Sequence, residues 1–205
     1  MPARYIPELD GLRALAIVGV LLFHLHVPGA EFGWAGVQLF FVLSGFLITG
    51  ILLNSKARSD YFSRFYVRRT LRIFPIYFLL LGLVLVYALL RRLPYSGFPW
   101  YAFYFQNYYI GWTSNHTQFP GLFAHTWSLA VEEQFYLLWP LIVWVLSPRS
   151  LIAFCCMLIV GGLTFQIAVG AITMNHFLAD AALPSCAAAL ALGALLASLN
   201  PELLT

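Results

Sequence analysis

The sequence predicts an all-α fold, a polytopic bundle of membrane helices, and three observations predict it. Hydrophobic residues make up 61% of the 205 residues and charged residues only 9%, whereas about 25% of an ordinary soluble domain is charged. The apolar residues fall into runs near the ~20 residues that cross a bilayer, enough for about five to seven transmembrane segments. The basic residues concentrate in one segment, as is typical of loops that set membrane orientation.

These apolar runs can be placed in order along the chain. The candidate spans are residues 12–27, 36–53, 73–90, 98–112, 127–146, 151–172 and 184–199. The run 98–112 is short, aromatic and interrupted by Gln106 and Asn107, so it is either a full span or an interfacial or re-entrant piece. We treat residues 1–205 as one domain.

The charge distribution orients the chain and excludes some classes of protein. The basic segment 54–72 is expected in the cytoplasm, which places the N-terminus there too. The net charge of +3 is small and favours membrane orientation over nucleic-acid binding. Cys155, Cys156 and Cys186 lie in apolar stretches without metal-ligand spacing, so we expect neither a disulfide framework nor a bound metal.

The first helix carries ionisable side chains that a bilayer disfavours. At about 100° per residue, Arg13 and His24 face the same way, and Asp10 lies within about 60° of them. One interpretation is structural: Arg13 extends to the interface and His24 bonds a neighbouring helix. The other is a buried passage in which neutral His24 acts as a general base.

The second run contains the small residues Gly36, Ser44 and Gly45. Small residues let membrane helices approach closely, so packing is the favoured interpretation. The alternative is a surface on which Phe40 and Phe41 grip an acyl chain or a cofactor.

The basic segment places Arg64, Arg68 and Arg72 on one stripe of a helix, with Arg69 and Arg72 as an R-x-x-R pair. Attraction to anionic lipid headgroups explains such a stripe. A phosphate clamp also explains it, because guanidinium groups bind phosphate oxygens in a bidentate manner.

A fourth polar group begins at Trp127. Ser128 and Glu132 are four residues apart and share a helical face, while Glu133 and Gln134 turn toward others. The two acids are either a solvated helix start or buried groups paired with Arg13, His24 or an arginine of the basic segment.

At this point the sequence resembles the acyltransferase-3 family of membrane O-acyltransferases. The matching stretches are Y-I-P-E-L-D-G-L-R-A-L-A-I ending in His24, G-V-Q-L-F-F-V-L-S-G-F-L-I, R-R-T-L-R-I-F-P-I-Y and W-S-L-A-V-E-E-Q-F-Y-L-L-W-P, in that order. Family members continue with further helices, so we expect this chain to be the N-terminal part of a longer domain.

The resemblance implies transfer of an acetyl or other short acyl group from acyl-CoA to a hydroxyl of a carbohydrate or lipid-linked glycan, in a bacterial inner membrane. Acyl-CoA would be a co-substrate, and no permanently bound cofactor is expected. The expected catalytic residues are His24, Glu132 and Arg13, with Glu132 orienting His24 or positioning the sugar. The expected coenzyme A ligands are Arg69, Arg72 and Arg68. The expected acceptor-binding residues are Asp10, Ser128, Trp127, Glu133 and Gln134. The alternatives are a transporter or channel component, or an inactive membrane scaffold.

Overall fold

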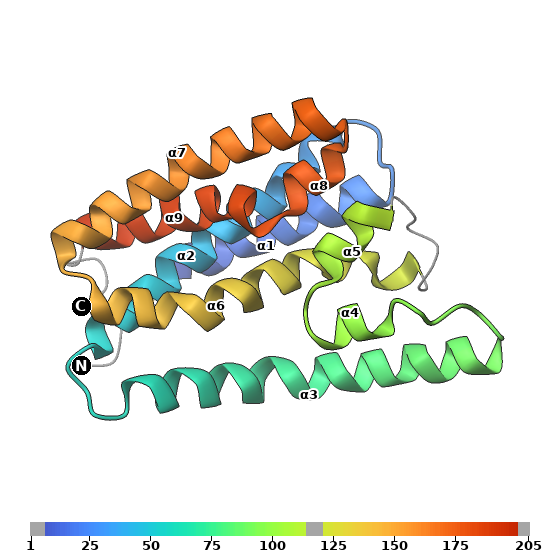
Figure 1. The fold of residues 1–205 in the computed structure, drawn as a ribbon, viewed down its shortest axis with the longest axis horizontal. Helices are drawn as coiled ribbons and strands as arrows, with labels where there is room; N and C mark the ends of the chain where they lie inside the picture. Colours follow the sequence, from blue (N-terminus) through green and yellow to red (C-terminus); the bar gives the residue numbers. More distant parts are fainter. Residues whose placement is uncertain (1–6, 114–120, 201–205) are drawn as a thin grey trace. The chain divides into compact units, whose positions relative to one another are not determined.

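The computed structural model describes residues 7–113 and 121–200, which form helices without any strand. This confirms the predicted all-α class. The elements (Figure 1) are α1 (Pro7–His24), the 3-10 helix η1 (Glu31–Trp34), α2 (Ala35–Ser55), α3 (Tyr61–Leu90), α4 (Phe98–Ala102), α5 (Gln106–Thr113), the 3-10 helix η2 (Gly121–Thr126), α6 (Trp127–Val145), α7 (Pro148–Thr173), α8 (His176–Ala181) and α9 (Leu183–Leu199).

Four helical stretches of the described residues are long and apolar enough to cross a membrane: Glu31–Ser55, Tyr61–Leu90, Pro148–Thr173 and His176–Leu199. This number is below the predicted five to seven. Charged or amide side chains interrupt α1 and α6, and α4 and α5 are only five and eight residues long. The composition and these stretches together make the chain an integral membrane protein.

The third predicted span lies within a longer helix. The span was expected from residue 73 and the arginines on a juxtamembrane helical stripe, and α3 begins at Tyr61 and joins the two in one helix. No glycine or proline lies between Tyr61 and Pro75 to end it. Of the two alternatives for the stretch 98–112, the structure favours the interfacial or re-entrant piece, because α4 and α5 are separated by a turn in which Tyr104 has a φ of 58°.

The chain divides into two compact units, which are described separately. The first comprises residues 1–57, 139–165 and 184–205, and the second comprises residues 58–138 and 166–183. Helices α6 and α7 contribute residues to both units.

Small residues at close backbone contacts hold the first unit together. Helices α1 and α2 lie side by side (Figure 1), and a Cβ on Gly36 would lie 2.5 Å from the carbonyl oxygen of Ala16. Helix α2 contacts α9 in the same way, because a Cβ on Gly45 would overlap the carbonyl of Leu190. The packing interpretation of Gly36 and Gly45 is therefore confirmed.

Two long-range hydrogen bonds reinforce the first unit. The buried indole Nε1 of Trp139 donates to Oγ1 of Thr49 over 2.8 Å. The Nζ of Lys56 donates to the carbonyl oxygen of Leu146 over 2.7 Å. Lys56, the first basic residue of the segment 54–72, thus donates to a carbonyl just beyond the C-terminal end of α6. The last carbonyl groups of a helix have no partner within the helix.

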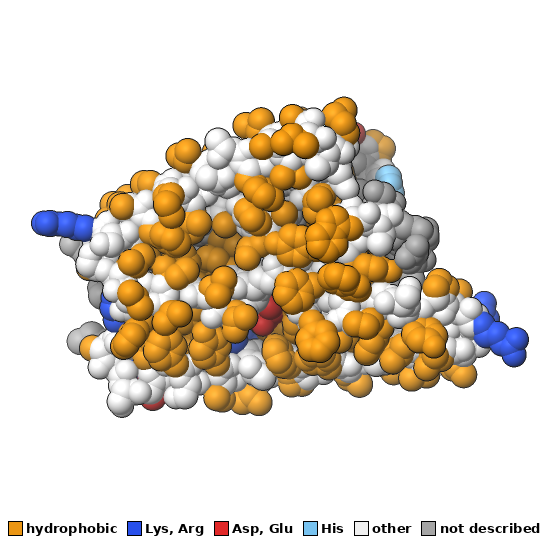
Figure 2. Space-filling model, viewed as in Figure 1, with side chains coloured by type: hydrophobic (Ala, Val, Ile, Leu, Met, Phe, Trp, Pro, Cys, Tyr) orange, Lys and Arg blue, Asp and Glu red, His pale blue; other side chains and the backbone are white. Residues whose placement is uncertain are grey.

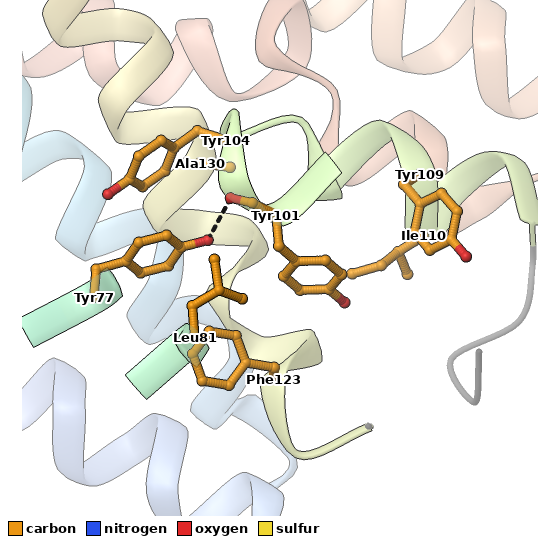
Figure 3. Close-up of a cluster of buried hydrophobic side chains, with 8 residues drawn as sticks. All are labelled: Tyr77, Leu81, Tyr101, Tyr104, Tyr109, Ile110, Phe123 and Ala130. Atoms are coloured by element: carbon orange, nitrogen blue, oxygen red, sulfur yellow. Dashed lines mark hydrogen bonds between the residues drawn. The ribbon is translucent and has the colours of Figure 1, made fainter. Parts of the chain in front are cut away.

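An aromatic cluster forms the core of the second unit (Figure 3). The rings of Tyr77 and Tyr104 stack with centroids 4.5 Å apart, and Phe123 lies 6.0 Å from Tyr77. The hydroxyl of Tyr77 donates to the carbonyl of Tyr101 over 2.8 Å. The cluster fixes the hairpin of α4 and α5 against α3 and the start of α6.

Hydrophobic side chains cover most of the visible surface (Figure 2). Leu71, Leu90 and Ile172 are examples, each at least 70% exposed. Such a surface is unfavourable in water and suits contact with lipid tails.

Candidate functional site

The first group of candidate residues lies on α1. Nη1 of Arg13 is 3.5 Å from Oδ1 of Asp10, one helical turn away. Both side chains are partly exposed. The predicted proximity of the acid and the guanidinium is confirmed, and their pairing orients the guanidinium near the start of the helix.

His24 is the last residue of α1 and is exposed. Its Nδ1 lies 2.8 Å from the carbonyl oxygen of Val20. A carbonyl oxygen only accepts, so Nδ1 must carry the proton, and a neutral ring then presents the lone pair of Nε2. The local backbone therefore makes Nε2, and not Nδ1, the nitrogen that can accept a proton.

The arginines of the basic segment fall into separate environments. Arg58 and Arg64 both contact Asp60, at 2.7 Å and 3.6 Å. The hydrogen bond from Arg58 lowers the pKa of the Asp60 carboxyl below its ordinary value. Arg68 and Arg72 are exposed, so both guanidinium groups can reach a phosphate from solvent.

Arg69 differs from its neighbours because it packs on an aromatic ring. Its Cζ lies 4.7 Å from the centroid of Tyr136 and 5.9 Å from that of Phe65. This is the geometry of a cation–π interaction. The two arginines of the R-x-x-R pair therefore differ, since Arg69 contacts α6 and Arg72 does not share that environment.

The polar residues of α6 differ in burial and in their contacts. Glu132 is buried, and Glu133 lies within electrostatic reach of both Glu132 and Arg69. These positions favour buried acids over a solvated helix start. The ring of Trp127 packs edge-on against Phe177, and Oγ of Ser128 lies 3.4 Å from the carbonyl oxygen of His125.

Gln134 makes contacts within the protein. Its Nε2 donates to the carbonyl of Tyr104 over 2.6 Å and to Oδ1 of Asn107 over 3.0 Å. These bonds use the amide nitrogen of Gln134, a residue expected to bind an acceptor, and they tie α6 to the turn at Tyr104 and to the start of α5.

A buried hydrogen-bond network extends from this point. Nε2 of Gln106 donates to the carbonyl oxygen of Thr126 over 3.0 Å and to Oη of Tyr77 over 3.3 Å. Nδ2 of Asn107 donates to the carbonyl of Ala181 over 3.0 Å. Sequence reasoning used Gln106 and Asn107 only to question a span. Two adjacent amides in an aromatic run were the available signal, because buried polar side chains require partners.

The sequence of the described fold matches a known family. The acyltransferase domain family, acyltransferase 3, matches residues 6–205. The chain belongs to this family. No solved structure matches the chain.

Curated relatives of this acyltransferase-3 chain carry related names. It is 35% identical to the peptidoglycan O-acetyltransferase OatA of Listeria monocytogenes, covering 73% of this chain and 26% of that protein. The putative peptidoglycan O-acetyltransferase YrhL of Bacillus subtilis is also 35% identical, with the same two shares. The O-acetyltransferase OatA of Staphylococcus aureus is 36% identical, covering 73% of this chain and 27% of that protein. The chain spans about a quarter of the length of these relatives.

The candidate residues of the acyltransferase-3 chain thus form two groups. Asp10, Arg13 and His24 belong to the first unit, whereas the arginines of α3 and the polar residues of α6 from Trp127 to Gln134 belong to the second. Within the second unit the structure brings Arg69 near Glu133. Within the described ranges, no three His, Cys, Asp or Glu side chains are grouped as a metal site would require.

Proposed function

We propose that this chain is part of a membrane O-acyltransferase that moves an acetyl or other short acyl group from acyl-CoA to a hydroxyl of a glycan. Membership of the acyltransferase-3 family and the names of the relatives support this reaction and a peptidoglycan-like acceptor. The observation that carries the proposal is the bond from His24 Nδ1 to the carbonyl of Val20, which leaves Nε2 available as a base.

In this mechanism Nε2 of His24 takes the proton of the acceptor hydroxyl as that oxygen attacks the thioester carbonyl carbon. The carbon–sulfur bond breaks, and the coenzyme A thiolate takes the proton back from His24. The products are the O-acyl glycan and coenzyme A, so atoms and charge balance without a metal. The ion pair with Asp10 orients Arg13, which lies on the same helical face as His24.

The arginines of α3 are the proposed donor site. Arg68 and Arg72 are exposed and can bind the phosphates of coenzyme A. Arg69 lies against Tyr136 and near Glu133, so it adds positive charge at the helix face next to them. The proposed orientation places the N-terminus and this end of α3 on the cytoplasmic side of a bacterial inner membrane, where acyl-CoA is available. Glu132, Ser128 and Trp127 remain proposed contributors to catalysis and acceptor binding.

A histidine substitution tests the chemistry. We expect His24→Ala in the full-length protein to abolish glycan O-acetylation in cells, and His24→Gln to do the same. Glutamine can still donate to the Val20 carbonyl but has no basic lone pair, so it separates structure from proton transfer. His26→Ala, two residues on, is the matched control and should retain activity. Unchanged acetylation in His24→Ala at equal expression would remove the histidine from the mechanism.

Donor binding is tested without turnover. We expect acetyl-CoA to raise the melting temperature of the detergent-purified protein, and Arg68→Ala/Arg72→Ala to lose at least about tenfold in affinity, since each phosphate contact contributes roughly 1–3 kcal/mol. Arg91→Ala/Arg92→Ala, at the other end of α3, is the control. A melting temperature that does not change on addition of acetyl-CoA would contradict the assignment of acetyl-CoA as the donor.

A further inference from the structure

Several polar side-chain atoms of the second unit are enclosed without a hydrogen-bond partner among the described residues. They include the hydroxyl oxygen Oη of Tyr104 and the carboxyl oxygen Oε1 of Glu133. Tyr104 is only 8% exposed. A buried polar atom without a partner costs about 1–3 kcal/mol, so two of them in one region require an explanation.

A hydrogen bond brings the two residues into one region, because Nε2 of Gln134, the neighbour of Glu133 in the sequence, donates to the carbonyl oxygen of Tyr104 over 2.6 Å. The Glu133 carboxyl and the Tyr104 hydroxyl also interact electrostatically. Figure 3 shows the Tyr104 hydroxyl pointing away from the hydrogen bond between Tyr77 and Tyr101. It is therefore not part of that bond.

Contacts of both the ring and the backbone fix the position of Tyr104. Its ring stacks on Tyr77 and lies 5.7 Å from Phe74. Its backbone has a φ of 58°, a conformation that L-residues rarely adopt, and Gln134 holds its carbonyl oxygen at 2.6 Å. Gln134, adjacent in sequence to Glu133, is thus a positioning residue for Tyr104. Strain of this kind persists where surrounding contacts maintain it and is frequent at binding sites.

We propose that Tyr104 and Glu133 form a binding site for one hydroxyl group, which accepts a hydrogen bond from Tyr104 and donates one to Glu133. A hydroxyl has one donor and two acceptor positions, so it satisfies both groups at once. The hydroxyl belongs either to the glycan acceptor or to a bound water. The glycan assignment rests on the proposed function, whereas the site itself does not.

A double-mutant cycle in the detergent-purified full-length protein tests the site. The variants are Tyr104→Phe, Glu133→Gln and their combination, with Tyr95→Phe, an exposed tyrosine, as control. Each is measured for thermal stability without glycan and for the affinity of a soluble peptidoglycan disaccharide, read as a thermal shift that needs no turnover. Gln134→Met is added, and should weaken binding as Tyr104→Phe does while leaving the stability shift given by acetyl-CoA unchanged.

Removing a tyrosine hydroxyl that has no partner leaves the protein equally or more stable, whereas removing one that is bonded to another hydroxyl destabilises it. If the bound hydroxyl belongs to a glycan, Tyr104→Phe and Glu133→Gln each weaken disaccharide binding about tenfold, and the double variant binds little more weakly than either single variant. If it is water, binding is unchanged and the same non-additive loss appears in stability. Additive effects in both measurements, or a more stable Tyr104→Phe protein, would overturn the proposal. Absence of acetyl transfer in the parent protein would contradict the proposed function alone.

Discussion

The first unit is held together by small residues that let backbones touch, whereas the second is held by stacked rings and buried hydrogen bonds. In the first, Gly36 and Gly45 lie against carbonyl groups of neighbouring helices. In the second, the amide of Gln106 joins α5 to α3 and η2, and the amide of Gln134 joins α6 to the turn at Tyr104. The difference implies that the first unit is sensitive to added volume and the second to lost polarity. A region already built from polar side chains is also the region that can bind a polar ligand.

The largest effect is expected at the contact of α2 with α9. In Gly45→Ala the new methyl group would overlap the carbonyl of Leu190, which is backbone and cannot rotate away. We expect a loss of about 3 kcal/mol in the free energy of unfolding, measured in mixed micelles. Gly161→Ala in the same unit meets nothing within 4 Å and should change stability by less than about 1 kcal/mol. Equal behaviour of the two variants would contradict close packing.

The second unit should respond to a change that preserves volume. Gln106→Met keeps the length of the side chain but removes the donor to Thr126 and Tyr77. We expect a loss of about 2 kcal/mol, because buried acceptors are left without a donor. Gln166→Met is the matched control, since Gln166 donates a single exposed bond to Asp180, and should lose under about 1 kcal/mol. If Gln106→Met were as stable as the parent, hydrogen bonds would not be what holds this unit.

The smallest effect is expected at the hydrogen bond between Trp139 and Thr49 in the first unit. Trp139→Phe removes the bond to Thr49 and should cost about 1 kcal/mol. Thr49→Val should cost a similar amount, and the double variant should lose little more than either single one. Strict additivity would show that the bond contributes nothing and that the two residues act only by filling space.

Much of the fold followed from the sequence because membrane helices depend on simple features. Length, hydropathy and small residues predicted most helices and the close contact made by Gly45. The sequence placed Arg64, Arg68 and Arg72 on one helical stripe but did not show that this stripe and the span from residue 73 form one helix. Helix formation depends on the whole run, and nothing between Tyr61 and Pro75 ends it.

The candidate site was less accessible from sequence. Helical periodicity placed Asp10 beside Arg13 because the two are one turn apart. It could not show that Nδ1 of His24 bonds its own helix, nor that Arg69 packs on Tyr136, 67 positions along the chain. The network of Gln106 and Asn107 depends on a turn at Tyr104 with an uncommon φ, and no periodic pattern predicts such a turn.

Pro75 gives α3 an internal weak point. Proline has no amide hydrogen, so the carbonyl of Leu71 lacks its usual partner one turn later. The helix is most easily bent there, just beyond the last arginine. Residues 61–74 before it form an uninterrupted helical stretch, so Arg68 and Arg72 stay one helical turn apart on the same face.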